Sequence, residues 1–331
     1  MLTIYCALFV EAQEIIKTFQ LKKETEKHHF QVFSDVGKGI RLVITGVGAI
    51  AAATAVAEIS TCYPPGKADL LCNFGSSAAV EGIPIGTVYF CNKLTEENTV
   101  RTFYPDLCYR HPFGEAELVS CGHVRTAEQL AGEHVALSVG ECVQSIDCAE
   151  LRLYDMEAAA IYQAANFYYG PHQMIFLKVV TDHGCMENSE IIENVAKDTI
   201  VGESAVDEKQ NRRSSTHTVN LRERMEMLMQ NVAMSVCPYI ETLCEISHAQ
   251  EREYQDQALL RRNTEEEAER FGNELHCSAV MGGELRQLLF YWRLTGTDYE
   301  IFLEDYRRQG RLPAKDKREG KRILDELKAR L

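Results

Sequence analysis

Three acidic residues lie where apolar segments of this 331-residue chain end, and a carboxyl group in such a place can do chemistry. Glu11 follows the apolar run Leu2–Leu8, and Asp182 ends the run Met174–Val180. Glu157 directly precedes an alanine-rich stretch. Each group could transfer a proton or accept hydrogen bonds. A simpler explanation also exists, because acids are favoured in the first turn of a helix and in the loops that follow strands.

A glycine-containing segment suggests a binding loop for a nucleotide. Thr45-Gly46-Val47-Gly48-Ala49-Ile50-Ala51 follows an apolar run and has the G-x-G-x-x-A spacing of dinucleotide-binding loops. Its backbone amides would approach a ligand at the start of a helix. In dinucleotide-binding proteins an acidic residue follows the next strand, whereas here Asp69 precedes Leu70–Asn73. The segment therefore favours a helix entry over NAD or FAD binding.

A second glycine-containing segment is Asn73-Phe74-Gly75-Ser76-Ser77-Ala78, which we predict to be a turn at the carboxyl end of the strand Asp69–Asn73. Open α/β sheets bind ligands at that edge, where small residues and hydroxyl groups hold a sugar or an anion. A tight turn without a ligand explains the same residues.

Apolar runs alternate with alanine-rich helical stretches up to about residue 180. Several of the runs are continuously apolar, which is typical of a sheet that helices cover on both faces. We therefore predict a three-layer α/β/α sandwich with a central mixed sheet. The expected strands are Leu2–Leu8, Phe30–Phe33, Ile40–Thr45, Asp69–Asn73, Thr87–Cys91, Val135–Val139 and Met174–Val180. The expected helices are Glu11–Phe19, Ala49–Ser60 and Met156–Tyr168.

The composition changes after Asp182, and we expect two domains, 1–248 and 249–331. Residues 185–217 are rich in charge and are predicted to be a flap or insertion, followed by a long amphipathic helix over 219–248. The second domain is predicted to be an all-helical appendage. Its apolar residues Leu285, Leu288, Leu289 and Trp292 recur at helical spacing, and Thr264 and Thr297 begin T-x-x-E capping boxes that predict helix starts.

Taken together and in this order, these features resemble the nucleoside phosphorylase and nucleosidase superfamily, most closely its methylthioadenosine/S-adenosylhomocysteine nucleosidases. The most specific part combines Met156-Glu157 at a helix start with Thr181-Asp182 at a strand end. Glu11, the Gly46-Val47-Gly48 segment, Gly75-Ser76 and the strand entry Ile85-Gly86-Thr87-Val88 complete it. The resemblance covers about residues 1–247.

The resemblance implies cleavage of the N-glycosidic bond of a purine nucleoside, through a sugar with oxocarbenium character. Asp182 would be the general acid at the purine, and Glu11 would activate the attacking water. Glu157 would accept hydrogen bonds from the ribose, and Met156 would pack against it. The segment Gly75, Ser76 and Ser77 would line the pocket beside the base or the attacking group.

Water is favoured over phosphate as the attacking group. Phosphorylases of the superfamily place an arginine just before the glycine segment, where this chain has Asn73, and Leu8–Glu11 contains no basic residue. A phosphate-dependent phosphorylase remains an alternative. So does a nucleoside sensor without catalysis, because Cys142 and Val143 occupy the stretch where the family has an aromatic residue stacked on the base. A scaffold that uses the fold only for packing is a third alternative.

Composition narrows the class of partner. The net charge of −14 repels phosphate backbones, so nucleic acid is not an expected partner. The first apolar run is interrupted by Glu11 and no run approaches the length of a membrane span, so we expect a cytoplasmic protein without membrane contact. The twelve cysteines include no CxxC pair, and we expect neither a metal nor an organic cofactor. The resemblance also implies a homo-oligomer, a dimer or larger, in which residues 103–113 of a neighbour would close the pocket.

Overall fold

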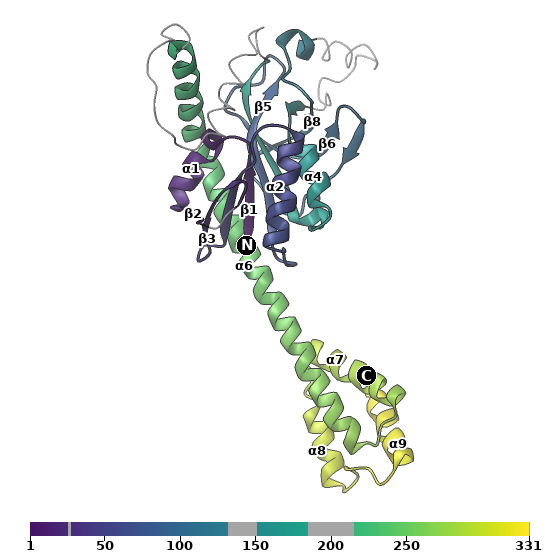
Figure 1. The fold of residues 1–331 in the computed structure, drawn as a ribbon. Coiled ribbons are helices and arrows are strands. Elements are labelled where there is room, and N and C mark those ends of the chain that lie inside the picture. The colour runs from purple at the N-terminus through teal and green to yellow at the C-terminus, as the bar shows by residue number, and fades with distance from the viewer. Residues whose placement is uncertain (26–27, 132–150, 185–214, 331) are drawn as a thin grey trace. The chain divides into compact units, whose positions relative to one another are not determined.

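The structure is a computed structural model that describes residues 1–25, 28–131, 151–184 and 215–330 (Figure 1). The chain divides into two compact units, Met1–Glu251 and Arg252–Leu331. The predicted strand 135–139, the residues Cys142 and Val143, and positions 185–214 of the predicted insertion lie outside the described residues.

The N-terminal unit is built on a ten-stranded mixed sheet with the order β10-β6-β8-β9-β5-β1-β4-β3-β2, in which β7 pairs with β6. Strand β10 also pairs with β5, so β10, β6, β8, β9 and β5 form a closed ring. The strands are β1 (Leu2–Cys6), β2 (Lys22–Lys23), β3 (Gln31–Asp35), β4 (Ile40–Ile44), β5 (Leu70–Ala79), β6 (Val88–Glu96), β7 (Arg101–Phe103), β8 (Gly114–Ser120), β9 (Arg152–Asp155) and β10 (Met174–Asp182).

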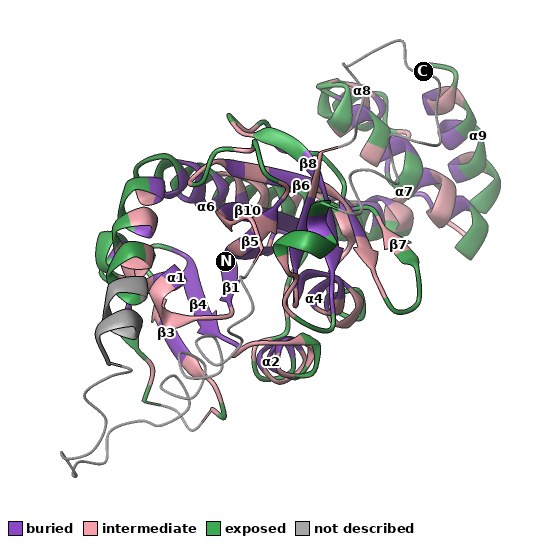
Figure 2. Cartoon of the chain, turned by 90° about the horizontal axis from the view of Figure 1, so that it is seen from above, coloured by how far each residue is buried: buried purple, intermediate pink, exposed green. Residues whose placement is uncertain are grey.

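Helices cover both faces of this sheet, because successive strand side chains point to opposite faces and both sets are apolar. On one face, Ile4 packs in a core with α1 (Phe9–Phe19) and with residues 229–244 of α6 (Ser215–Glu274). On the other face, Tyr5 packs in a core with α2 (Ala49–Cys62) and α4 (Ala158–Ala165). Figure 2 shows the buried strands between these helices. The predicted α/β/α sandwich with a mixed sheet is therefore confirmed.

Strand β5 corrects one local prediction. It continues through Asn73–Ala78 to Ala79, so the predicted turn at Gly75 is wrong. Parallel pairing with β10 holds the segment extended, with Val179 opposite Ser76 and Asp182 opposite Ala78. Strands β2, β7, β8 and β9 were not predicted.

Helix α6 corrects a second prediction, because it begins at Ser215 and ends at Glu274, well beyond the predicted end at residue 248. Residues 215–217 of the predicted insertion belong to this helix. Thr264 does not start a helix: it is buried inside α6, and its hydroxyl donates to the carbonyl oxygen of Leu260 at 2.7 Å. None of the helices that the structure describes is both long enough and apolar enough to span a bilayer.

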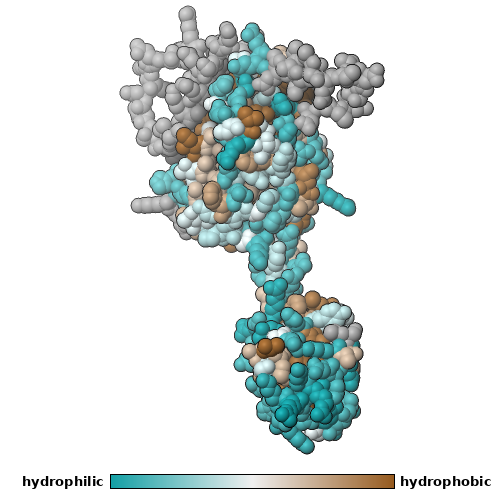
Figure 3. Space-filling model, turned by 90° about the vertical axis from the view of Figure 1, so that its right-hand side faces the viewer, coloured by the Kyte–Doolittle hydropathy of each residue, from teal (hydrophilic) through white to brown (hydrophobic). Residues whose placement is uncertain are grey.

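The C-terminal unit has its own helical core, formed by the end of α6 with α7 (Ala279–Leu294), α8 (Glu300–Arg308) and α9 (Lys317–Lys328). Trp292 is buried at its centre and stacks on Tyr299 at 5.7 Å between ring centroids. The predicted face of α7 with Leu285, Leu288 and Leu289 is buried in this core. Hydrophilic side chains cover most of this unit on the side shown in Figure 3.

Candidate functional site

The parallel strands β1, β5 and β10 lie side by side, so their carboxyl ends meet at one edge of the sheet. Glu11 lies in the first turn of α1, directly after β1. Ser76 and Ser77 lie near the end of β5, and Asp182 ends β10. The sheet topology therefore brings residues from three distant parts of the sequence to one edge, which is where open α/β sheets bind ligands.

The carboxylate of Glu11 is buried and held by three hydrogen bonds. One oxygen accepts from the Ser76 amide at 2.8 Å and from the Ser76 hydroxyl at 2.6 Å. The other oxygen accepts from the Leu8 amide at 2.9 Å. A Cβ atom on Gly75 would lie 3.1 Å from both oxygens, so glycine at this position leaves room for the carboxylate. Gly75 therefore serves Glu11 and does not form a turn.

Glu157 is the N-cap residue of α4 and points toward the start of α2. Its carboxylate accepts a hydrogen bond of 2.7 Å from the amide of Gly48, whose φ of 98° glycine adopts without strain. Burial and then the neighbouring Asp155 raise the pKa of Glu157 to about 7, against the opposing effects of Lys178 and the Gly48 amide. The Gly46–Gly48 segment thus binds a carboxylate of the protein itself.

Sequence reasoning missed Lys178, whose side chain is 2% exposed in the middle of β10. Its ammonium group lies 2.8 Å from the carboxylate of Asp155, at the end of β9. Burial alone would lower the pKa of Lys178, but Asp155 and Glu157 raise it above its usual value, with a further contribution from Glu11. A single lysine in the apolar run Met174–Val180 was the available signal, since an unpaired ammonium group is rarely buried.

Asp182 lies apart from this buried group, roughly 13 Å along β10 from Lys178 at about 3.3 Å per residue. It is only partly buried. Its two oxygens accept hydrogen bonds from the Thr181 hydroxyl at 3.0 Å and from the Gly184 amide at 2.9 Å. The hydroxyl of Thr181 also lies 3.3 Å from the carbonyl oxygen of Ser77, which ties Asp182 to the end of β5.

The other predicted site residues have mixed positions. Ser77 is buried, and its hydroxyl donates to the carbonyl oxygen of Val179 at 3.0 Å, so it joins β5 to β10. Met156 is partly buried between β9 and α4. Cys142 and Val143 lie outside the described residues, so their predicted contact with the base stays a prediction.

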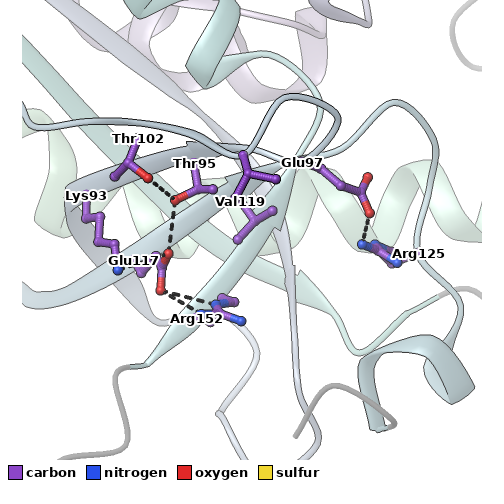
Figure 4. A pocket seen from close by; sticks show the side chains of 9 residues that line it. Lys93, Thr95, Glu97, Thr102, Glu117, Val119, Arg125 and Arg152 are labelled. Carbon is purple, nitrogen blue, oxygen red and sulfur yellow. Dashed lines mark hydrogen bonds and ion pairs between the residues drawn. The ribbon is translucent and has the colours of Figure 1, made fainter. Parts of the chain in front are cut away.

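A surface pocket of about 440 Å³ lies on the opposite face of β8 and β9 from Asp155 (Figure 4). Glu117 in β8 lines it, and Arg152 of β9 donates to Glu117 at 3.0 Å. Glu117 and Val119 alternate along β8 with Ser120, which bonds to Asp155, so the two groups face opposite ways. Among the described residues, no group of three or more histidines, cysteines and acids is arranged to hold a metal ion.

Comparisons with known proteins give matches to solved structures only. No family model matches the chain, and no curated protein matches it. The 5′-methylthioadenosine/S-adenosylhomocysteine nucleosidase from Neisseria meningitidis, in complex with methylthio-immucillin-A, is 15% identical with a TM-score of 0.43, over 70% of this chain and 98% of that one. Arabidopsis thaliana 5′-methylthioadenosine nucleosidase in apo form is 16% identical with a TM-score of 0.45, over 70% and 95%.

A third match is the 5′-methylthioadenosine/S-adenosylhomocysteine nucleosidase from S. pneumoniae with the transition-state inhibitor MT-ImmA. It is 15% identical with a TM-score of 0.45, over 71% of this chain and 99% of that chain. At these identities the likeness concerns the fold alone. The three proteins belong to the family that the sequence resembles.

Proposed function

We propose that this chain hydrolyses the N-glycosidic bond of a purine nucleoside of the methylthioadenosine or adenosylhomocysteine type. Such a reaction needs a group that activates water, a group that holds the ribose and an acid that protonates the leaving base. Glu11, Glu157 and Asp182 supply three carboxyl groups for these tasks. Glu11 is close enough to Glu157 for its charge to contribute to the raised pKa of Glu157, and Asp182 ends β10 at the same sheet edge.

The observation that carries the proposal is the way Glu11 is held. Its carboxylate accepts hydrogen bonds from the amide of Leu8 and from the amide and hydroxyl of Ser76. These donors would otherwise be available to bind an anion at this sheet edge. A carboxylate fixed in this way can accept a proton from a water molecule on its remaining lone pairs. It also repels a second anion, so phosphate is disfavoured as the attacking group.

Charge supports water over phosphate a second time. The ammonium group of Lys178 contacts Asp155 and is within electrostatic reach of Glu157 and Glu11. A phosphate ion would add negative charge to a group in which acids already outnumber the base. Phosphorolysis is therefore the weaker alternative.

Glu157 is suited to hold a ribose. The Gly48 amide fixes one of its oxygens at 2.7 Å and leaves the other for the sugar hydroxyls. Ionised Glu157 accepts these hydrogen bonds more strongly than its protonated form, because charge-assisted hydrogen bonds are roughly twice as strong as neutral ones. Because its pKa is raised to about 7, binding should tighten as the pH rises through neutrality.

In this proposal Asp182 acts at the other end of the substrate. The Thr181 hydroxyl and the Gly184 amide orient its carboxyl group at the sheet edge. A carboxylic acid there would protonate the purine nitrogen as the glycosidic bond breaks. In this scheme the buried group around Glu11 activates the water and holds the ribose, and the partly buried Asp182 protonates the leaving base.

The test is to incubate the chain with methylthioadenosine, adenosylhomocysteine, adenosine or inosine and to separate the products by liquid chromatography. Free base formed at equal rates with and without phosphate is the expected result, and Glu11→Gln should abolish it. A strict phosphate requirement would reassign the chain as a phosphorylase. Intact nucleosides that bind in calorimetry would make it a sensor and contradict hydrolysis.

A further inference from the structure

Asp155 occupies a joint between two strands and a helix. One oxygen accepts from the hydroxyl of Ser120, at the end of β8, at 2.6 Å. The other accepts from the amide of Ala158, at the start of α4, at 2.9 Å, and lies 2.8 Å from the ammonium group of Lys178. Ser120 is itself fixed, because its hydroxyl oxygen accepts from the amide of Ala159 at 2.9 Å. The orientation of Asp155 is therefore determined by three backbone elements at once.

Lys178 needs such an anchor because its side chain ends in an ammonium group on four flexible carbons. The charged groups that act on it are Asp155, Glu157 and Glu11. Three buried thiols, on β1, β5 and β6, also interact electrostatically with Lys178. Burial raises the pKa of each, so they are neutral near pH 7 and leave the carboxylates as its counter-charges; they are Cys6, Cys72 and Cys91.

We propose that Asp155 is a positioning residue: fixed by Ser120 and α4, it holds the Lys178 ammonium group within electrostatic reach of Glu11 and Glu157 and so sets the charge that Glu157 presents to the substrate. This inference rests on the proposed hydrolysis for the roles of Glu11 and Glu157. Asp155 itself does not touch the substrate in this scheme. It acts through Lys178 and through its own negative charge next to Glu157.

Removing the charge of Asp155 has a consequence of definite sign. Asp155 raises the pKa of Glu157 and Lys178 lowers it. In Asp155→Asn the first effect disappears, and Lys178 has one carboxylate fewer to neutralise it. The titration of Glu157 should therefore move down by about one pH unit or more, because a nearby like charge shifts a carboxyl pKa by this amount.

The experiment compares Asp155→Asn with Glu117→Gln, which removes an equally buried carboxylate paired with Arg152 on the opposite face of β8 and β9. The pH dependence of nucleoside KM is measured from pH 5 to 9 together with kcat. In Asp155→Asn we expect the KM midpoint to move to lower pH and kcat to fall about tenfold or more, since Lys178 is no longer held. In Glu117→Gln we expect the midpoint of the unaltered chain.

A second readout does not require activity. The chain is labelled with ¹³C at the glutamate carboxyl groups and titrated by NMR, with Glu157→Gln identifying the Glu157 signal. A lower midpoint in Asp155→Asn supports the positioning role even where no nucleoside is cleaved, which separates it from the proposed reaction. An unchanged Glu157 midpoint in folded Asp155→Asn would overturn the inference.

Ser120→Ala keeps every charge and covers the case in which Asp155→Asn does not fold. It removes the 2.6 Å hydrogen bond that orients Asp155. We expect kcat to fall a few-fold, by about 3–10, with the KM midpoint unchanged, because every charge is kept and Asp155 loses only one of its hydrogen bonds. Turnover equal to that of the unaltered chain would contradict the positioning role.

Discussion

Two ion pairs use acids on opposite faces of strands β8 and β9, and they differ in how their charges are balanced: Glu117 of β8 pairs with Arg152 of β9, and Asp155 of β9 pairs with Lys178 of β10. On the outer face, Glu117 contacts Arg152 at 3.0 Å and Lys93 at 3.3 Å, so one acid meets two bases. On the opposite face, which we call the inner face, Lys178 contacts Asp155 at 2.8 Å, and Glu157 and Glu11 also act on it, so one base meets three acids. These four residues are the inner group. The contacts are similar in length, but the two regions differ in the ratio of their charges and in burial, because Arg152 is 25% and Lys93 27% exposed, whereas Lys178 is 2% exposed.

The pKa values follow that ratio. Burial alone would raise the pKa of Glu117, but Arg152, Thr95 and Lys93 lower it below its usual value. Burial raises the pKa of Glu157 to about 7, and the excess of acids around it works in the same direction. A carboxylate with a surplus of bases stabilises the fold, whereas a buried surplus of acids costs stability. Such a cost is typical of functional sites, where perturbed pKa values gather.

Apart from Glu11→Gln, which should abolish turnover, Asp182→Asn should give the largest effect on activity. The amide cannot protonate a leaving base, while it keeps the size of the side chain and its place beside Thr181 and Gly184. Turnover should fall by a factor on the order of 10² or more. Circular dichroism should report an unchanged fold. Activity within a few-fold of the unaltered chain would remove Asp182 from its role and restrict the chemistry to the inner group of charges.

Glu157→Gln should give the next effect and tests the surplus of acids directly. The neutral side chain can still accept from the Gly48 amide, but it is a weaker acceptor for ribose hydroxyls. We expect KM above pH 8 to rise about tenfold or more and to lose its dependence on pH near 7. A KM that kept the original pH profile would assign that titration to another group.

The same substitution has a predicted effect on stability. The pKa of Glu157 is higher in the folded chain than in the unfolded one, so ionisation destabilises the fold as the pH rises from about 4.5 to 7. Glu157→Gln removes this cost. The free energy of unfolding should increase by about 1–3 kcal/mol at pH 8 and change little at pH 4, as denaturant titration would show.

Gly75→Ala should reduce activity through a steric effect on Glu11. The new Cβ atom would lie 3.1 Å from both carboxylate oxygens, and three hydrogen bonds prevent Glu11 from moving freely. We expect kcat to fall about tenfold, as a misplacement of this kind commonly costs up to 10².

Gly283→Ala is the matched control for this substitution. Gly283 lies inside helix α7, and a Cβ atom there meets nothing within 4 Å. The change should leave turnover unaltered and raise stability by about 0.5–1 kcal/mol. Equal turnover in Gly75→Ala and Gly283→Ala would show that the place of Glu11 has no effect on the reaction.

The architecture could be predicted from sequence because its causes are local. Continuously apolar runs such as Ile40–Ile44 are strands buried on both faces, and Ala49–Cys62 is a helix that starts at Gly48. The prediction at Gly75 was wrong because the residue that requires glycine there is distant in sequence: the carboxylate of Glu11 occupies the space that a side chain would need. The prediction at Thr264 was wrong because a T-x-x-E spacing also fits the interior of a helix.

The charged residues of the candidate site could be predicted only individually and not as a group. Glu11, Glu157 and Asp182 stood out because each follows or precedes a regular element. Asp155 directly precedes Met156-Glu157 in the sequence, and it accepts a hydrogen bond from the amide of Ala158 at the start of α4. That Lys178 contacts it depends on how the strands β9 and β10 are arranged in the closed ring, which no spacing in the sequence specifies.

Glu117→Gln should give the smallest effect on activity, and its effect on stability should be opposite in sign to that of Glu157→Gln. The pKa of Glu117 is lower in the folded chain than in the unfolded one, so its ionised form stabilises the fold above the unfolded pKa and this contribution is lost as the pH falls through the folded pKa. The substitution should lower the free energy of unfolding by about 1–2 kcal/mol at pH 7 and by almost nothing at pH 3. The loss at pH 7 is limited because Arg152 and Lys93 are partly exposed and regain water.

Turnover in Glu117→Gln should match the unaltered chain at every pH, and thermal unfolding at pH 7 and pH 3 supplies the stability readout. The same chemical change then has opposite effects at the two glutamates. Glu157→Gln stabilises the fold and weakens substrate binding, whereas Glu117→Gln destabilises the fold and leaves turnover unchanged. A loss of turnover in Glu117→Gln comparable to that in Glu157→Gln would mean that the balance of charge does not distinguish the two faces. The functional site would then have to include the outer pocket of Figure 4.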